Sequence, residues 1–275
     1  MIRILSLGAG VQSTTLALMS ARGDLPAVDY AIFADTGWEP EAVYKHLAWL
    51  ETQLPFPVLR GARPGADLGE HAIAIATSDV TRTASPPWFT EGPRGMLPRQ
   101  CSKEYKVRVI GQKVREILGL KRGERGPKGK AVEQWIGISL DEMQRMKAAE
   151  QPFVENCFPL IEARMTRRDC LAWMQDRQYP RPPKSSCIFC PYRGDDQWRD
   201  MRDNAPDDWQ KAVAFDAAIR PGFYGMGGEA YVHRQRVPLA DVDLSTAADH
   251  GQFDMFEELS REASIQDECE GICGV

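Results

Sequence analysis

Cysteines are the residues of this chain whose type and spacing most directly predict chemistry. The sequence contains seven, and two of them form the run Cys187-Ile188-Phe189-Cys190, followed by Pro191. A Cys-x-x-Cys turn brings two thiolates to one metal ion, and the proline fixes the backbone where it leaves the turn. Because we expect a cytoplasmic protein, where disulfide frameworks are rare, metal binding, thiol chemistry and buried packing remain. The spacing alone fits zinc, an iron–sulfur cluster or a redox dithiol.

A glycine-rich turn near the N-terminus predicts a phosphate-binding site. The run Ser6-Leu7-Gly8-Ala9-Gly10-Val11-Gln12-Ser13-Thr14 joins a predicted strand to a predicted helix. Glycines there let backbone N–H groups approach a phosphate, the helix N-terminus favours negative charge, and Ser13 and Thr14 add hydroxyl donors. The pattern predicts a phosphate-bearing ligand without naming it. The simpler alternative is that the glycines only tighten the turn.

A dinucleotide site is one interpretation of this turn. Gly8-x-Gly10-x-x-Ser13 nearly matches G-x-G-x-x-G, and Asp35 ends the second predicted strand, where a ribose-binding acid belongs. Against NAD or FAD, Ser13 replaces the third glycine. A dinucleotide also leaves the cysteines unexplained.

The elements that must position these residues alternate between strand and helix. Predicted strands cover residues 2–7, 28–34, 58–59 and 132–138, and predicted helices cover 11–21, 39–50, 102–118 and 170–177. Thr166 and Asp169 form a capping-box pattern before the last of these helices. This order predicts an α/β fold with a doubly wound, mostly parallel sheet in residues 1–200. Residues 201–275 are predicted to form a helical C-terminal extension that ends in a cysteine-bearing tail.

Composition narrows the class of protein. Of the 275 residues, 43% are hydrophobic and 27% are charged, which is ordinary for a globular protein and argues against disorder. The net charge of −5 gives no general attraction to nucleic acid or membranes. The apolar run at the N-terminus is too short for a signal peptide, and no run is long enough to span a bilayer. We expect a cytoplasmic protein without a membrane partner, and a homo-oligomer.

Several stretches resemble, in the same order, segments of one superfamily. Gly8–Ser13 resembles the PP-loop of adenine-nucleotide α-hydrolase-like proteins, usually written SGGxDS. Gln12 at the aspartate position looks like the phosphoadenosine phosphosulfate (PAPS) and adenosine phosphosulfate (APS) reductases, whereas Ser13 looks like the ATP-cleaving members. The other resembling stretches are 34–41 (DTG-x-x-x-PE), 99–106 (CC-x-x-x-K), 158–161 with 166–169 (PL…WTR-x-D), 186–190 (GC-x-x-C) and 268–271 (ECG tail).

The resemblance implies a PP-loop fold and a sulfonucleotide reductase that converts PAPS or APS to sulfite. In such enzymes a tail cysteine, here Cys269, attacks the sulfur, and a thioredoxin-type protein supplies the electrons. The residues assigned to the nucleotide are Ser6, Gly8, Ala9, Gly10, Gln12, Ser13, Thr14, Asp35, Thr36 and Gly37. The residues assigned to catalysis are Cys269, Cys273, Arg145 and Lys106.

The resemblance also implies a [4Fe–4S] cluster, with zinc as the alternative. Cys101, Cys187 and Cys190 supply three thiolates, and a cluster takes four protein ligands or three plus an exchangeable one. The fourth ligand is assigned to Cys273, with Cys269 and Cys157 as alternatives. Two features depart from the family, because Gln100 precedes Cys101 where a paired cysteine is usual, and Cys273 stands in a tail that lacks the final histidine. Apart from that alternative for Cys157, we predict that Cys157 and Cys170 are small buried hydrophobic residues.

Other functions stay open at this point. The main alternative is ATP-dependent sulfur transfer to tRNA or DNA, since residues 121–130, KRGERGPKGK, have the charge of a nucleic-acid contact. A zinc-stabilised nucleic-acid-binding module would explain the cysteines but not the glycine turn. Arg145 either follows a helix start capped by Ser139 or Asp141, or meets a substrate phosphate or sulfate.

Overall fold

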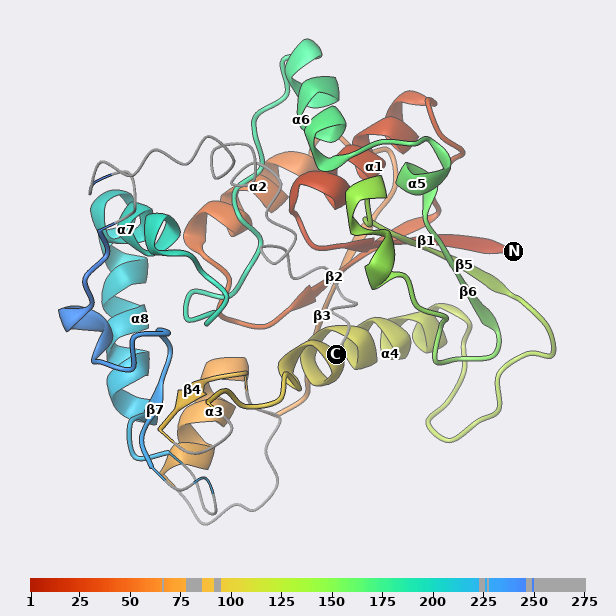
Figure 1. Cartoon of the computed structure of the whole chain (residues 1–275). Coiled ribbons are helices and arrows are strands. Elements are labelled where there is room, and N and C mark those ends of the chain that lie inside the picture. The colour runs from red at the N-terminus through yellow and green to blue at the C-terminus, as the bar shows by residue number, and fades with distance from the viewer. Residues whose placement is uncertain are drawn as a thin grey trace.

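A five-stranded parallel sheet forms the centre of the protein. The computed structural model describes residues 1–65, 67–77, 86–91, 95–222, 226, 228–245 and 249. The strands are β1 (Ile2–Leu7), β2 (Tyr30–Asp35), β3 (Val58–Ala62), β5 (Val132–Ile136) and β6 (Val154–Cys157), in the order β3-β2-β1-β5-β6 (Figure 1). Every neighbouring pair is parallel. The predicted α/β fold with a parallel sheet is confirmed.

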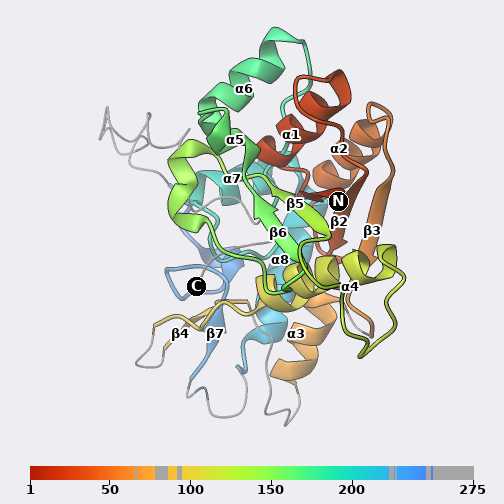
Figure 2. The same cartoon turned by 90° about the vertical axis from the view of Figure 1, so that its right-hand side faces the viewer.

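Alternation along the strands explains why helices cover both faces of the sheet. Leu5 and Leu7 of β1 belong to one buried cluster, whereas Ile4 belongs to another, as expected when successive side chains point to opposite faces. The helices on the first face are α1 (Val11–Arg22), α2 (Glu41–Glu51) and α6 (Arg167–Asp176), and α4 (Arg108–Ile117) covers the second (Figure 2).

Helix boundaries differ from the predictions at two functional places. Glu39 was predicted to open a helix, but α2 begins at Glu41 after Pro40, and Glu39 lies buried before it. The predicted helix over 102–118 contains a π-helical stretch, η1 (Lys103–Val107), before α4. Such π-helical stretches are rare and often occur at functional sites. The helix ends as predicted before Gly119, which has a left-handed φ of 70°.

A second cluster of elements lies beyond the carboxyl ends of the strands. It contains α3 (Leu68–Ala76), α7 (Asp195–Asn204), α8 (Pro206–Ile219) and the antiparallel pair β4 (Phe89–Thr90) and β7 (Ala230–Tyr231). Their shared buried cluster draws on residues from Leu68 to Leu244 and includes Cys187. The predicted boundary at residue 200 falls inside α7. The short elements are α5 (Pro159–Glu162), η2 (Leu140–Arg145) and η3 (Leu239–Asp241).

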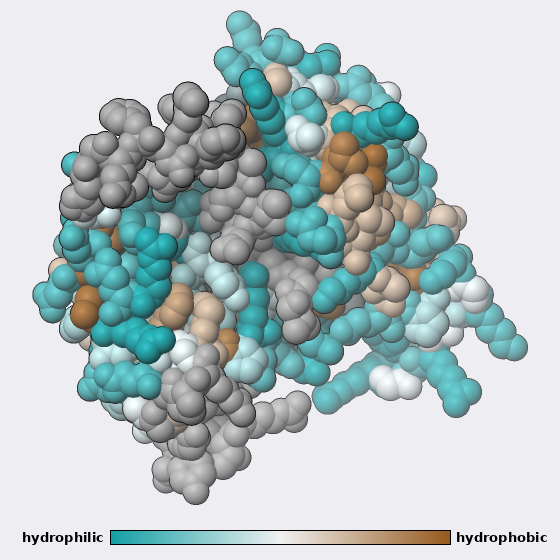
Figure 3. All heavy atoms as spheres, in the orientation of Figure 1, coloured by the Kyte–Doolittle hydropathy of each residue, from teal (hydrophilic) through white to brown (hydrophobic). Residues whose placement is uncertain are grey.

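On the face drawn in Figure 3, the described residues are mostly hydrophilic. Hydrophobic atoms gather in the upper right of this face, over the region of α5 in Figure 1. No helix among the described residues is long and apolar enough to cross a membrane.

Candidate functional site

The turn between β1 and α1 has the geometry of an anion site. Ala9 has a φ of 56°, in the left-handed region that favours glycine, and Gly10 caps α1 with extended backbone. Ser13 Oγ accepts a hydrogen bond from the Gly8 N–H at 3.2 Å. No acidic side chain occupies the first turn of this 12-residue helix, so the positive end of its dipole is left for a ligand. Ser6 precedes the turn as a buried residue of β1.

Gln12 connects the turn to η2. Its Nε2 donates to Glu142 Oε2 at 3.0 Å and lies 3.3 Å from Ser139 Oγ. Arg145 donates to the other carboxylate oxygen of Glu142. Gln12 Oε1 is buried without a hydrogen-bond partner, and such an atom calls for a donor from elsewhere. Arg145 is therefore linked to the turn through Glu142.

Thr14 is held by a histidine from α2. Its Oγ1 lies 3.1 Å from Nε2 of His46. Burial lowers the pKa of His46 to about 4, so the imidazole is neutral at physiological pH. The contact fixes α1 against α2 without adding a charge next to the turn.

The end of β2 is built around Asp35. Its Oδ1 accepts hydrogen bonds from the Gly37 N–H and from the Tyr44 hydroxyl, each at 2.8 Å. Gly37 has a φ of 77°, and a Cβ there would lie 2.7 Å from Cβ of Asp67. Asp35 thus shapes the turn in which Thr36 and Gly37 lie, and one of its oxygens is occupied by the protein itself.

The Cys-x-x-Cys run packs directly against the end of β2. The Cys190 N–H donates to the Cys187 carbonyl at 3.0 Å, and the Ile188 N–H donates to the Trp38 carbonyl at 2.8 Å. Cys187 Sγ lies 3.5 Å from Thr36 Oγ1. The ring of Phe189 stacks on Phe215 at 3.7 Å between centroids. The hydrophobic side chain inside the run anchors it to the second cluster of elements.

One hydrogen bond joins the cysteine segment to the phosphate turn. The Ser185 hydroxyl donates to the carbonyl oxygen of Gly8. The segments predicted from the sequence as the nucleotide turn, the end of β2 and the cysteine run therefore meet at the carboxyl edge of the sheet. Edges of this kind are the usual ligand sites of parallel α/β sheets.

Two buried cations lie beside the cysteines. Lys106, from η1, pairs with Glu39 at 3.3 Å between Nζ and Oε1. Arg193 donates from Nη2 to the Ser186 carbonyl at 2.9 Å. Burial lowers the pKa of Arg193, whereas negative charge on Cys190, Cys187 and Glu39 acts in the opposite direction. The positive charge of Arg193 therefore lies close to Cys187, Cys190 and Glu39.

The donor chemistry fits a thiolate-bound metal group. Cys187 and Cys190 present two thiols from one turn beside buried positive charge. The neighbouring atoms Glu39 Oε2, Ser186 Oγ and Arg193 Nε are buried without hydrogen-bond partners. Cys101 packs against the hydrophobic cluster that contains Cys187. Within the described part of the chain, however, no three His, Cys, Asp or Glu side chains are gathered around a common metal position.

The remaining cysteines divide into two groups. Cys170 is fully buried in the core between α1 and α6, as predicted for a packing residue. Cys157 is partly buried at the end of β6, and burial raises the pKa of its thiol to about 11. Both thiols are therefore unreactive at neutral pH. Cys269 and Cys273 lie outside the described residues.

Three contributors to the site were not predicted from the sequence. Glu39 was assigned to the first turn of a helix, and Ser185 and Arg193 were given no role in this site. The sequence did contain an indication of the role of Arg193, because this residue follows Cys190 by three positions. The turn that holds the two thiols therefore also holds this cation near both sulfur atoms.

Comparison with known proteins adds no assignment. No protein-family model matches the sequence, and no curated protein is significantly similar to it. The resemblance to sulfonucleotide reductases rests on the motifs alone.

Proposed function

We propose that this protein is a PP-loop enzyme that binds an adenine nucleotide at the Gly8–Thr14 turn and acts on sulfur beside it. The leading activity is reduction of PAPS or APS to sulfite. The supporting observation is the meeting of the phosphate turn with the cysteine run, through the bond from Ser185 to Gly8 and the contact of Cys187 with Thr36. If the glycine turn only connected β1 to α1, there would be no reason for thiols and buried cations to lie at the same edge of the sheet.

In the proposed reaction the Cys269 thiolate attacks the sulfur of the sulfonucleotide. An S–S bond forms, the bond from sulfur to the bridging phosphate oxygen breaks, and the nucleotide leaves with the electron pair on that oxygen. A dithiol protein of the thioredoxin type then attacks the cysteine sulfur, sulfite departs, and the second thiol of that protein completes a disulfide. We assign to Lys106 and Arg145 the role of offsetting the negative charge of the sulfate and phosphate groups.

A metal group is assigned to Cys101, Cys187, Cys190 and Cys273. A bound [4Fe–4S] cluster would supply iron that polarises a substrate sulfur or oxygen atom. Zinc at the same thiols is the alternative, and it would stabilise the turn without redox chemistry.

The second candidate is ATP-dependent transfer of sulfur to a nucleic acid. The loop over residues 121–130 favours it, because the cations Lys121, Arg122, Arg125, Lys128 and Lys130 are all exposed there. Backbone phosphates are attracted by such a loop.

Anaerobic purification followed by metal analysis and nucleotide titration tests the proposal. We expect a brown protein with iron and sulfide in equal amounts, loss of colour in Cys187→Ser, and tighter binding of PAPS or APS than of ATP. A preference for ATP would favour sulfur transfer. A colourless protein that holds zinc and binds no nucleotide would contradict both enzymatic proposals and favour a zinc-stabilised nucleic-acid-binding module.

The turn itself is tested by Gly10→Asp. A carboxylate among the phosphate-binding N–H groups should weaken adenine-nucleotide binding by at least tenfold, or about 1.4 kcal/mol. Gln53→Asp is the control, since it adds the same charge at an exposed residue that follows α2. Equal binding by the two variants would place the nucleotide elsewhere.

A further inference from the structure

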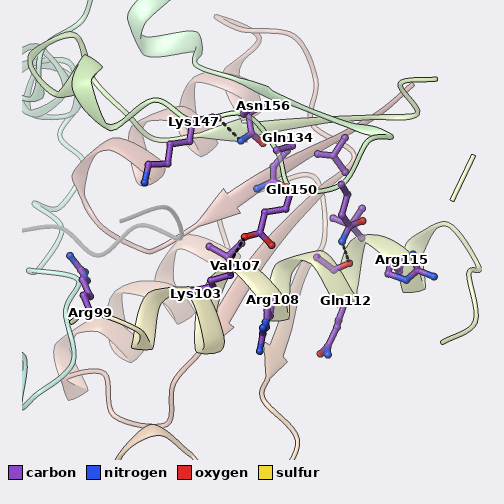
Figure 4. A pocket seen from close by; sticks show the side chains of 16 residues that line it. Arg99, Lys103, Val107, Arg108, Gln112, Arg115, Gln134, Lys147, Glu150 and Asn156 are labelled. Atoms are coloured by element: carbon purple, nitrogen blue, oxygen red, sulfur yellow. Dashed lines mark hydrogen bonds and ion pairs between the residues drawn. The ribbon is translucent and has the colours of Figure 1, made fainter. Parts of the chain in front are cut away.

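A cavity separate from the proposed site lies between the helix formed by η1 and α4 and the strands β5 and β6 (Figure 4). Its volume is about 390 Å³, and none of its lining residues belongs to the glycine turn or the cysteine run. Lys103, Val107, Gly111 and Arg115 line it at intervals of four residues. This spacing puts them on one face of the helix. The volume is within the range of small-ligand sites.

Positive charge is concentrated in this cavity. Five cationic side chains and one anionic side chain line it: Arg99, Lys103, Arg108, Arg115 and Lys147, against Glu150. Glu150 pairs with Lys103 at 3.2 Å, and Figure 4 shows this pair in the middle of the cavity. Arg108 pairs with Glu104, which does not line the cavity. Because the whole chain carries a net charge of −5, the local excess of cations does not follow from composition. It predicts an anionic ligand.

Two amide oxygens in the cavity call for hydrogen-bond donors. Gln151 Oε1 and Asn156 Oδ1 are buried without hydrogen-bond partners. Their amide nitrogens donate to the carbonyls of Gly111, at 3.2 Å, and Lys147, at 2.9 Å, which fixes both side chains. At Gly111 a Cβ would lie 2.6 Å from Gln151 Nε2, so glycine makes room for this amide. The missing partners are N–H or O–H groups; sulfate provides none, and a phosphate provides only its remaining P–O–H groups.

A second cavity of about 450 Å³ adjoins the first and shares Lys147 and Asn156 with it. It extends to Lys130, the last residue of the basic loop over 121–130. Arg115 ties the first cavity to the same loop, since its Nη2 donates to the carbonyls of Lys121 at 3.0 Å and Glu124 at 2.6 Å. The two cavities thus share part of their lining, and each is in contact with the loop, through Arg115 and through Lys130. We refer to the two cavities and the loop together as the positively charged track.

We propose that this track binds a single-stranded nucleic acid. The cations contact successive backbone phosphates, and the amides of Gln151 and Asn156 accept hydrogen bonds from a base amino group or a ribose hydroxyl. A single strand fits because its unpaired nucleotides enter concave cavities that exclude a duplex. The inference stands without the function proposed for the glycine turn, although a nucleic acid held here would suit the sulfur-transfer alternative.

Binding of a labelled single strand of about twelve nucleotides, of AMP and of pyrophosphate tests the proposal. The measurements are made in the Gly10→Asp protein, so that the glycine turn does not contribute. Lys147 is an exposed lining residue, and Lys211 is an exposed lysine of α8 outside both cavities. We expect Lys147→Glu to weaken strand binding about tenfold or more and Lys211→Glu to leave it nearly unchanged. Equal losses in the two variants would overturn the proposal, because they would indicate general electrostatic attraction.

A second variant separates nucleotide recognition from anion binding. Gln151→Met keeps the length of the side chain and removes its amide, so it should weaken strand binding and leave pyrophosphate binding unchanged. If it leaves strand binding unchanged, the cavity is an anion site only and the proposal fails. If AMP binds with the same sensitivity to Lys147→Glu and the strand does not bind, the ligand is a free nucleotide, and the assignment to a nucleic acid is wrong.

Discussion

At the scale of single residues, the site is characterised by buried charged side chains. Lys106 and Glu39 form an ion pair with side chains only 6% and 1% exposed. A buried charge is costly unless its partner is present. Lys106 was predicted from its position after Cys101, but its partner was not, because Glu39 looks like an ordinary acid at the start of a helix.

Replacement of one residue of the Lys106–Glu39 pair should therefore lower the free energy of unfolding much more than replacement of both. We expect Lys106→Met to lower the free energy of unfolding by about 3 kcal/mol, since it leaves Glu39 buried without its paired cation. The double variant Lys106→Met with Glu39→Gln should recover much of this loss. Urea unfolding at pH 7 measures both, and equal losses in the single and double variants would show that the pair does not couple.

His46 predicts a specific loss of stability in acid. Burial lowers its pKa from 6.5 to about 4, so the unfolded chain takes up this proton at a higher pH than the native protein. His46 therefore has no effect on stability above pH 6.5, and stability falls as the pH decreases from there toward 4, by at most about 3 kcal/mol. His46→Gln keeps an amide for Thr14 and should lack this part of the pH dependence. The difference in unfolding free energy between the two proteins at pH 7 and pH 4.5 measures it. If that difference is the same at both pH values, His46 is not the titrating group.

At the scale of elements, the position of α3 controls the cysteine turn through Trp38. The carbonyl of Trp38 accepts the hydrogen bond of Ile188 inside the cysteine run, at 2.8 Å. Its indole Nε1 donates to Asp67, the N-cap of α3, at 2.8 Å. A Cβ on Gly69 would lie 2.1 Å from Cε2 of the same ring. The helix, the indole and the cysteine run are thus in direct contact.

Gly69→Ala should disturb both the fold and the site. The methyl group forces Trp38 to move, and overpacking of this kind costs about 1–3 kcal/mol. The movement should also reduce the metal content of the purified protein, because Trp38 supports the cysteine turn. A combined Trp38→Phe and Gly69→Ala variant has a smaller ring and should regain stability relative to Gly69→Ala alone. No recovery would mean that the ring is not what opposes the methyl group.

Local patterns predicted some elements and not others, for physical reasons. β1 and the start of α1 were predicted correctly because an apolar run, a glycine turn and a helical pattern follow one another. The capping box of Thr166 and Asp169 was also correct. β6 was missed because Val154–Cys157 is short and half polar. Lys106, Thr36 and Cys187 were predicted separately, but their common site depends on long-range packing that a sequence pattern does not contain.

At the scale of the whole molecule, the cysteine edge and the positively charged track lie on different parts of one compact sheet. The first is at the carboxyl ends of β1 and β2, and the second is between α4 and the strands β5 and β6. In the sheet, β5 lies between β1 and the edge strand β6 (Figures 1 and 2). A reductase requires only the first region and a mobile thiol, whereas transfer of sulfur to a nucleic acid requires both.

The C-terminal cysteines distinguish these two activities. The sequence around Cys269 is acidic, Asp267-Glu268-Cys269-Glu270, and neighbouring negative charge disfavours a thiolate. The proposed reductase mechanism requires this segment to reach the cysteine run, where neighbouring positive charge would favour the thiolate. We expect Cys269→Ser to bind PAPS or APS normally and to lose turnover by orders of magnitude, with Cys273→Ser milder. Mass spectrometry of the native protein mixed with PAPS or APS, without reductant, should show a sulfonate adduct on Cys269.

Truncation before Asp267 completes this test, because it removes both tail cysteines together. Under the reductase mechanism the truncated protein keeps its affinity for the sulfonucleotide and loses both turnover and the adduct. If no adduct forms on the full chain and the truncated protein keeps full activity, the tail thiol is not the nucleophile. If truncation instead removes the iron, a tail cysteine is the fourth ligand, and it cannot also travel to the substrate. Sulfur transfer to a strand held in the positively charged track then becomes the better account. In the full chain, Lys147→Glu should then weaken binding of the strand about tenfold or more while leaving the iron in place.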